Sequence, residues 1–252
     1  MALPLSGRVA LITGGASGIG AATVTALADL GADIAVFDRS LPPSGLPGEP
    51  VDRPRITRYE LDLGQEERIA LAVQEVLAAF GRIDILVNCA AINGKPAPTA
   101  GLELTAAVWR EIFAVNVTAP LLLMQEVARH MIRRGHGGRI VNVTSSSAHR
   151  AESPPAYASS KAALTQLTRS MAAELAEHDI NVNNVAPGAT RTPFGGVDDA
   201  ILEERVRTGP TANLLRRVSE PRDVAAAIVF LCLPESRQIT AQTIHTSGGL
   251  VV

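Results

Sequence analysis

Short apolar, β-branched runs alternate with longer stretches of helical periodicity along almost the whole chain. Between most of these runs, apolar residues recur at i, i+3 and i+4, as they do on one face of a helix. Apolar strands separated by helices are typical of a parallel sheet that is covered on both faces. The expected strands are 8–13, 33–38, 56–61, 84–88, 139–145, 180–186 and 242–246, and the clearest helical stretches are 18–30, 66–80, 105–134 and 155–177. We therefore predict an α/β fold, a doubly wound three-layer sandwich with about seven parallel strands.

One segment interrupts this alternation. Residues 40–55 contain five prolines and two glycines, and proline blocks helix propagation because it lacks an N–H donor. We expect an irregular loop there in place of a crossover helix. The chain has no linker that would divide it, and 252 residues are enough for one large domain. We predict a single domain over residues 1–252.

Charge and composition exclude several classes of partner. The 25 acidic residues are interspersed with 23 basic ones, and the net charge of −2 gives no attraction to nucleic acid or to an anionic membrane. No run approaches the roughly 18 apolar residues of a membrane helix, and the first residues lack the pattern of a secretory signal. Cys89 and Cys232 are expected to be buried free thiols, and the five histidines have no metal-site spacing. We predict a cytoplasmic protein without a metal.

The segment TGGASGIG, residues 13–20, follows the first expected strand and opens the first expected helix. Glycines suit this place because a backbone without Cβ lets a pyrophosphate approach the amides and the positive dipole end of the helix. In this strand–turn–helix context, the spacing favours dinucleotide binding over a plain tight turn. The predicted contacts are Gly14, Ser17, Gly18, Ile19 and Gly20.

Asp38 is the next acidic residue at the end of an expected strand, about 20 residues past the glycines. A carboxylate there can accept hydrogen bonds from the adenosine ribose, and it would repel a 2′-phosphate. NAD is therefore favoured over NADP. Arg39 keeps the alternative open, because a guanidinium can pair with a 2′-phosphate. Otherwise Asp38 is a strand-end turn residue and Arg39 a solvated side chain.

Tyr157 and Lys161 lie four residues apart in an expected helix, in a chain with only two tyrosines and two lysines. Side chains at i and i+4 share one helix face. A free phenol, with a pKa of about 10, is a poor acid or base at neutral pH, and a nearby ammonium lowers that pKa. We expect Lys161 to lower the pKa of Tyr157 in this way. A bare pair at this spacing is usually a surface tyrosine beside a surface lysine, so the neighbouring motifs decide between the two interpretations.

Two further motifs accompany the pair. Serines 145–147 end an expected strand and offer hydroxyl donors to a carbonyl oxygen, and Asn116 lies within a long helical pattern, where it needs a specific partner. With these motifs the chain resembles the short-chain dehydrogenase/reductases, which have a Rossmann fold, along nearly its whole length. The resemblance is carried, in order, by TGGASGIG, Asp38, LDL (61–63), NCAA (88–91), Asn116, VTSS (143–146), YASSK (157–161) and PGATRT (187–192).

The resemblance implies a role for each matching residue. Tyr157 would be the general acid/base, and Lys161 would bind the nicotinamide ribose and lower the pKa of the tyrosine. Ser145, with Ser146 as the alternative, would hydrogen-bond the substrate oxygen, and Asn116 would hold a water in a proton relay. The further implied cofactor contacts are Asp62 and Leu63 at the adenine, Asn88 at the ribose side, Thr192 with the turn of Pro187 and Gly188 at the carboxamide and pyrophosphate, and Ala90 and Thr190.

The chain departs from the family pattern in three places. NCAA replaces the usual N-N-A-G, so that Ala91 stands where a glycine lies near the ribose. The proline-rich residues 40–55 replace a helix beside the adenosine pocket, and TSGG (246–249) stands where many relatives carry an acidic residue. None of these departures touches the proton-transfer residues.

The resemblance places substrate specificity in the loops 92–101, 146–155 and 190–220. These loops are polar, so we expect a polar, hydroxylated small molecule as the substrate. Its expected contacts are Asn93, Ser145, Ser147, His149 and Tyr157, although His149 is otherwise an ordinary loop histidine. The stretch of about 189–220 is long enough for a mobile lid, in which residues 203–207 would form a solvated helix face. The helices 105–134 and 155–177 are implied to form subunit contacts in a homotetramer or homodimer.

The expected reaction is the transfer of a hydride between NAD(H) and a secondary alcohol or ketone. The nearest alternative is an NADPH-dependent ketoreductase of the 3-oxoacyl type, and the two differ in cofactor preference. A non-catalytic nucleotide sensor would be expected to lack the tyrosine or the lysine. A methyltransferase of doubly wound fold would need no Y-x-x-x-K. The sequence therefore favours an oxidoreductase over both.

Overall fold

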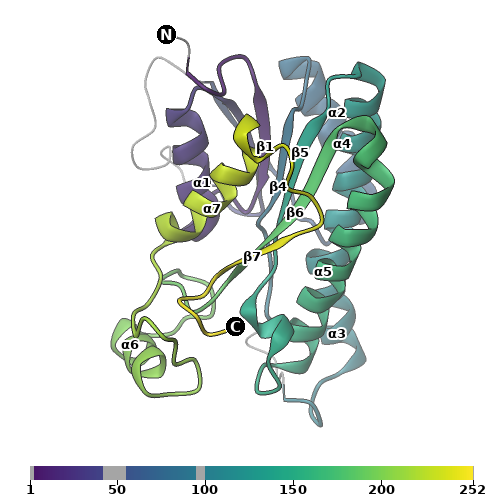
Figure 1. Cartoon of the computed structure of the whole chain (residues 1–252). Helices are drawn as coiled ribbons and strands as arrows, with labels where there is room; N and C mark the ends of the chain where they lie inside the picture. Colours follow the sequence, from purple (N-terminus) through teal and green to yellow (C-terminus); the bar gives the residue numbers. More distant parts are fainter. Residues whose placement is uncertain (1–2, 42–54, 95–99, 252) are drawn as a thin grey trace.

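The computed structural model describes residues 3–41, 55–94 and 100–251 (Figure 1). Seven strands form one parallel sheet in the order β3-β2-β1-β4-β5-β6-β7. The strands are β1 (Val9–Thr13), β2 (Asp33–Asp38), β3 (Ile56–Glu60), β4 (Ile85–Asn88), β5 (Gly138–Val143), β6 (Ile180–Pro187) and β7 (Thr243–Thr246). The sheet grows outward in both directions from β1 and β4, which makes their junction the topological switch point of a doubly wound sheet. The predicted fold class is confirmed.

Helices cover both faces of the sheet (Figure 1). The first face carries α1 (Gly18–Asp29) and α7 (Pro221–Cys232), and the second carries α2 (Glu66–Phe80), α4 (Ala119–Arg134) and α5 (Pro155–Leu175). The remaining helical elements are α3 (Ala106–Phe113), α6 (Asp199–Arg207) and the short turns η1 (Ala114–Thr118), η2 (Ser146–His149), η3 (Ala176–His178) and η4 (Pro234–Ser236).

Strand β1 shows why apolar runs without alternation mark the centre of this sheet. All five of its residues are buried. Ala10 and Ile12 belong to the same apolar cluster as Val24 of α1, whereas Leu11 belongs to the cluster of Val73 in α2. Successive side chains of a strand point to opposite faces, so a strand that is covered on both sides has to be apolar at every position.

The stretch 105–134, which was predicted as one helix, consists of α3, the π-helical turn η1 and α4. The run Ala106–Arg134 is long and apolar enough to cross a membrane, a test that core helices of soluble proteins also pass, and 39% of its most apolar window is buried. Leu123, Met124 and Val127 of α4 pack in the core against the sheet. The inner face of α4 therefore belongs to the core, while other residues of the run, such as Trp109 and Ile132, are exposed.

Two of the predicted loops fall partly outside the described residues. These parts are residues 42–54 of the expected irregular loop 40–55 and residues 95–99 of the expected substrate loop 92–101. The expected lid of about 189–220 is described throughout, and it contains α6.

Candidate active site

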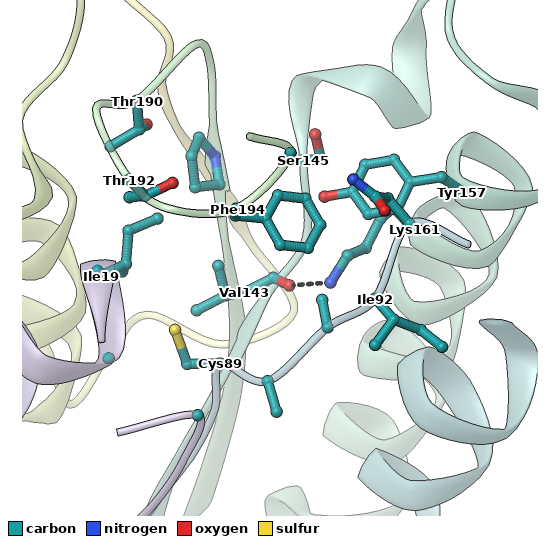
Figure 2. Close-up of a pocket in the computed structure, with 18 of the residues that line it drawn as sticks. Ile19, Cys89, Ile92, Val143, Ser145, Tyr157, Lys161, Thr190, Thr192 and Phe194 are labelled. Carbon is teal, nitrogen blue, oxygen red and sulfur yellow. Dashed lines mark hydrogen bonds between the residues drawn. The ribbon is translucent and has the colours of Figure 1, made fainter. Parts of the chain in front are cut away.

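A cavity of about 690 Å³ opens where β1 and β4 end, at the switch point of the sheet (Figure 2). Ligands of open α/β sheets bind at this place. Most of the predicted site residues line it, namely Gly14, Ser17, Gly18, Ile19, Gly20, Asp38, Arg39, Asp62, Leu63, Ala90, Asn93, Ser145, Ser147, Tyr157, Lys161, Pro187, Gly188, Thr190 and Thr192. Asn88, Asn116 and His149 are predicted site residues that do not line it.

The turn between β1 and α1 packs closely on itself and on the loop after β4, which only glycine allows at two of its positions. Gly14 has a φ of +67°, and a Cβ on it would lie 2.8 Å from the Cα of Ala90. A Cβ on Gly20 would lie 2.0 Å from the Gly14 carbonyl oxygen. Ser17 is the N-cap residue of α1, yet its side chain makes no capping hydrogen bond. The first amides of α1 therefore keep donors for an anion, as a pyrophosphate requires.

Asp38 is fixed at the end of β2. One carboxylate oxygen accepts a hydrogen bond from the backbone N–H of Ala16 at 2.9 Å, and the other accepts one from the N–H of Ser40 at 3.2 Å. The first bond ties the end of β2 to the glycine turn. Asp62 follows the neighbouring strand β3, and its Oδ1 accepts from the N–H of Gly64 at 2.9 Å. Both carboxylates thus lie at the same end of the cavity, where a ribose and an adenine are expected.

Tyr157 and Lys161 come from the first turns of α5, and both side chains face the cavity (Figure 2). Lys161 is only 1% exposed, and its Nζ donates a hydrogen bond of 2.8 Å to the carbonyl oxygen of Val143. The same Nζ lies 5.8 Å from the centroid of the Tyr157 ring. Ser145 follows Val143 by two residues, lines the same cavity as Tyr157, and accepts a hydrogen bond of 3.1 Å from the N–H of Ser147 with its Oγ. The end of β5 thus places both the serine and the anchor of the lysine.

In the protein without cofactor, the pKa of Tyr157 lies above that of a free phenol. Burial raises the pKa of Tyr157 to about 12, the hydrogen bond with Ser145 opposes that rise, and Cys89 adds to it. Burial also lowers the pKa of Lys161 to about 8. The ammonium is directed at a backbone carbonyl and not at the phenol, so desolvation outweighs its attraction for a phenolate. That Lys161 lowers the pKa of Tyr157 together with a positively charged nicotinamide ring stays a prediction for the protein with bound cofactor.

Asn116 does not line the cavity, but its hydrogen bonds fix residues next to it. It is completely buried in η1, where its Oδ1 accepts from the N–H of Ile92 at 2.9 Å and its Nδ2 donates to the carbonyl of Ile92 at 2.9 Å. The Nδ2 also donates to Ser160 Oγ at 3.0 Å. Ile92 lines the cavity, and Ser160 lies beside Lys161 in α5. Asn116 therefore joins the loop after β4 to α5. Ile92 and Ser160 are the specific partners that a polar residue at this position in a helix requires.

Asn88 and His149 were predicted as cofactor and substrate residues, and the structure engages both side chains elsewhere. Asn88 is 2% exposed, and its Nδ2 donates to Asn142 Oδ1 at 2.8 Å, so it supports the sheet under the cavity. His149 lies in the turn η2, which carries its ring against His245 of β7, with ring centroids 5.1 Å apart. Neither side chain reaches the cavity lining.

Several cavity residues have no counterpart among the predicted ones. The ring of Phe194 lies 5.7 Å from that of Tyr157, in the loop that also carries Thr192 (Figure 2). Arg150 and Arg205 line the cavity from the loop after β5 and from α6. Cys89 lines it as well, and burial raises the pKa of its thiol to about 12. The loops of the arginines and of Phe194 were predicted to bind substrate, but no spacing in the sequence selects these three side chains.

Arg191 fixes the start of the predicted lid. Its guanidinium bonds Glu220, the N-cap residue of α7, at 3.0 Å, and it pairs with Glu203 at 3.1 Å and Asp199 at 2.7 Å, both in α6. Hydrogen bonds with these three carboxylates raise the pKa of Arg191. Glu203 is exposed, as predicted, with a side chain that is 51% accessible, and it also helps to hold α6 against the start of α7.

Comparison with known proteins agrees with this geometry. A family model described as enoyl-(acyl carrier protein) reductase matches residues 14–251. Sorbitol dehydrogenase of Cereibacter sphaeroides is 36% identical over 254 residues, which cover 97% of this chain and 98% of that protein. The 3-oxoacyl-(acyl-carrier-protein) reductase FabG of Thermotoga maritima is 34% identical over 257 residues, with coverage of 98% and 99%. A crystal structure of a short chain dehydrogenase from Mycobacterium paratuberculosis bound to NAD is 33% identical, with a TM-score of 0.84 over 98% of both chains. The chain belongs to the short-chain dehydrogenase/reductase family.

Membership in the short-chain dehydrogenase/reductase family confirms the resemblance that the motifs carry. The chain is thereby an oxidoreductase with an NAD-binding Rossmann fold. Its relatives in this family differ in substrate, since they include dehydrogenases named for sorbitol and galactitol as well as a 3-oxoacyl reductase. The substrate of this short-chain dehydrogenase/reductase therefore has to be argued from its own cavity.

Proposed function

We propose that the protein transfers a hydride between NAD(H) and a secondary alcohol or ketone, with Tyr157 as the general acid/base. The observation that carries the proposal is that Ser145, Tyr157 and Lys161 line the same cavity as the glycine turn. The groups that move and hold a proton thus lie in one cavity with the groups suited to a dinucleotide. Relatives that are named dehydrogenases and reductases support this reaction class.

The cavity fits NAD by its own geometry. Gly14 and Gly20 keep the backbone open to a pyrophosphate, and the uncapped amides of α1 provide donors. Asp38 offers acceptors to ribose hydroxyls and would repel a 2′-phosphate. The NAD in the related short chain dehydrogenase supports the same cofactor here. When bound, NAD supplies the hydride acceptor for alcohol oxidation, and its reduced form supplies the donor for ketone reduction.

Tyr157 transfers the proton, and Ser145 hydrogen-bonds the substrate oxygen. In alcohol oxidation, Tyr157 as a phenolate takes the hydroxyl proton while the carbon of the same alcohol gives up its hydride, and a ketone results. In ketone reduction, the phenol returns that proton to the carbonyl oxygen. Ser145, which lines the same cavity as Tyr157, would donate to the same substrate oxygen and hold it at the phenol.

Lys161 acts through its charge and its remaining donors. One N–H of the ammonium is used by the carbonyl of Val143 at 2.8 Å, and an ammonium has three donors, so two remain for ribose hydroxyls. Because the pKa of Lys161 is about 8, most of it is charged at neutral pH. A charged ammonium on the face of α5 that carries Tyr157 favours the phenolate.

Replacing the phenol hydroxyl tests the proposal. We expect Tyr157→Phe to retain NAD binding and to lower kcat by about 10²-fold or more, because general acid/base catalysis is lost. The matched control is Tyr59→Phe, since the chain has only two tyrosines and Tyr59 lies in β3 outside the cavity lining. The control should keep full activity. Undiminished turnover of Tyr157→Phe would remove the tyrosine from the mechanism.

An NADPH-dependent ketoreductase is the second candidate, because Arg39 lines the cavity next to Asp38 and FabG is among the relatives. The two candidates differ in the ratio of kcat/KM for the two cofactors. We expect NAD to be preferred, and we expect Asp38→Ala to lower that preference by about 10-fold or more, because the repulsion of a 2′-phosphate is removed. A wild-type preference for NADPH would replace the first candidate by the second.

A further inference from the structure

The part of the cavity lining that comes from residues 143–211 contains three cations and no carboxylate. The cations are Lys161, which the proposed reaction uses, and Arg150 and Arg205, which it does not use. Resting on the proposed function, we infer that the alcohol or ketone substrate carries an anionic group, a carboxylate or a phosphate, which Arg150 and Arg205 recognise. A hydroxy acid and a hydroxyalkyl phosphate share the chemistry that these two guanidiniums would bind.

Arg205 projects from the face of α6 that lines the cavity. Leu202, one turn earlier, lines the cavity as well, and residues three apart share one face of a helix. Asp199 and Glu203 of the same helix are engaged with Arg191. Arg205 itself makes no side-chain hydrogen bond or ion pair with any residue that the structure describes. Its guanidinium is thus available to a ligand under the lid.

Arg150 lies on the other side, in the loop after β5, and its side chain is only 15% exposed. Its Nη2 donates to the carbonyl oxygen of Pro210 in the lid and forms a long ion pair of 3.5 Å with Glu152. Glu152 has a 71% exposed side chain and does not line the cavity. Within the described residues, the Nε and Nη1 of Arg150 have no hydrogen-bond partner. A nearly buried guanidinium with so little compensation favours an anion beside it.

The carboxylates of the cavity do not compensate these cations. They are Asp38, Asp62 and Glu111. Asp38 and Asp62 follow β2 and β3 at the end suited to adenosine, so only Glu111 of α3 is left to offset one of the three positive charges. A neutral polyol would leave Arg205 without a partner and Arg150 with only the Pro210 carbonyl and the exposed Glu152, whereas an anionic group would bind both guanidiniums.

The same region also defines the uncharged part of the substrate. Ile92, Phe194, Val197 and Leu202 form apolar lining, and the Phe194 ring lies 5.7 Å from the Tyr157 ring. A carbon skeleton can contact these side chains while the oxygen to be oxidised reaches Tyr157. The substrate is therefore a hydroxy or oxo compound with an apolar middle and an anionic end.

The test compares three alcohols that share one carbon skeleton and end in a methyl, a carboxylate or a phosphate group. Initial rates of NAD reduction give kcat/KM for each alcohol. We expect an anionic member to exceed the neutral one by about 10-fold or more, as charge-assisted hydrogen bonds provide. The anionic alcohol with the higher kcat/KM identifies the recognised group as a carboxylate or a phosphate. Added salt should reduce the advantage of the anionic member, because it screens the attraction.

Arginine variants show which side chain recognises the anionic group. Arg205→Gln should lower the ratio of anionic to neutral kcat/KM by about 10-fold, mainly through KM, and Arg205→Lys should restore part of it. Arg207→Gln is the matched control, because Arg207 ends the same helix without lining the cavity, and it should change nothing. Arg150→Lys tests the second cation with less disturbance of the lid than Arg150→Gln.

The outcomes separate this inference from the proposed function. Equal kcat/KM for the neutral and anionic alcohols, or equal effects of Arg205→Gln and Arg207→Gln, would overturn the anionic substrate and leave the hydride transfer standing. Failure to oxidise any of the three alcohols, and to reduce the corresponding three ketones, by protein that binds NAD would instead overturn the proposed function.

Discussion

At the scale of single residues, burial shifts Tyr157 and Lys161 in opposite directions. It raises the pKa of Tyr157 to about 12 and lowers that of Lys161 to about 8, because a low-dielectric site disfavours each charged form. Without cofactor the pair at neutral pH is therefore a neutral phenol near an ammonium that is held by a backbone carbonyl. Base catalysis by Tyr157 requires a lower pKa than this, and the positive charge of an oxidised nicotinamide would act in that direction.

We therefore expect NAD to lower the pKa of Tyr157. In the protein without cofactor, Tyr157 should form tyrosinate only near pH 12, and saturating NAD should move the transition to lower pH. The measurement is the ultraviolet absorbance of tyrosinate against pH. Subtracting the curve of Tyr157→Phe isolates this residue from Tyr59, whose pKa burial also raises. Identical curves with and without NAD would contradict the expected coupling.

The sequence predicted the shared face of Tyr157 and Lys161 because i, i+4 spacing is a local property of the helix. It did not predict the bond from Lys161 to Val143, because a backbone carbonyl 18 residues away in the chain has no side-chain signature. The contact between the rings of His149 and His245 was not predicted for the same reason, because His245 lies almost a hundred residues further along the chain. Contacts of this kind depend on tertiary placement, which composition and periodicity do not encode.

At the scale of elements, a row of polar side chains joins four strands to the catalytic helix. Asn88 of β4, Asn142 of β5, Asn184 of β6 and Thr243 of β7 are successive register partners. Asn88 donates to Asn142 at 2.8 Å, Asn142 donates to Thr168 of α5 at 2.8 Å, Thr168 donates to Asn184 at 2.6 Å, and Asn184 donates to Thr243 at 3.2 Å. Because the row holds α5, it also sets the position of Tyr157 and Lys161.

Asn142→Ala should lower the free energy of unfolding by about 3 kcal/mol, because the buried Nδ2 of Asn88 loses its acceptor and the row is interrupted. Denaturant unfolding measures this change. Combining Asn142→Ala with Asn88→Ala should cost less than the sum of the two single changes, since they remove the same bond. A loss below about 1 kcal/mol for the single variant would show that the row contributes little to stability.

The first and last residues of a strand or helix were predicted correctly where the apolar period changes sharply. Strand β2 and helix α2 have the predicted bounds, 33–38 and 66–80. The π-helical turn η1 was not predicted, because one extra residue in a turn hardly alters an apolar pattern that is already dense. Asn116 was its only sign, since a buried asparagine in a helix indicates a bond that the regular helix does not provide.

At the scale of the whole molecule, the sheet followed from the sequence, whereas the placement of α6 within the expected lid did not. A parallel sheet with short crossovers has few possible orders, because crossovers are right-handed. The place of α6 depends instead on Arg191 and its three carboxylates, which are spread over residues 191–220 and are indistinguishable in the sequence from solvated charges. Which arginine faces the cavity is settled only once α6 is fixed in this way.

The run Ala106–Arg134 also leaves apolar surface exposed on the molecule. Only 39% of its most apolar window is buried. Trp109 and Ile132 are each 37% exposed, and the Trp109 ring stacks on Phe113 with centroids 4.5 Å apart. A second copy of the chain that covered this surface would gain about 25 cal/mol for each Å² of apolar area removed from water. This surface is therefore consistent with the homotetramer that the family resemblance implied.

We expect sedimentation velocity to show a tetramer, and we expect Trp109→Glu to shift it to smaller species, because a carboxylate would be buried without a partner. Leu71→Glu is the matched control, since Leu71 is a 62% exposed apolar residue of α2 and not part of this run, and it should leave the mass unchanged. Trp109 is the only tryptophan of the chain, so wild-type fluorescence should shift to longer wavelength when dilution separates the subunits. A monomeric wild-type protein, or equal behaviour of the two glutamate variants, would show that this helix does not form the contact between subunits.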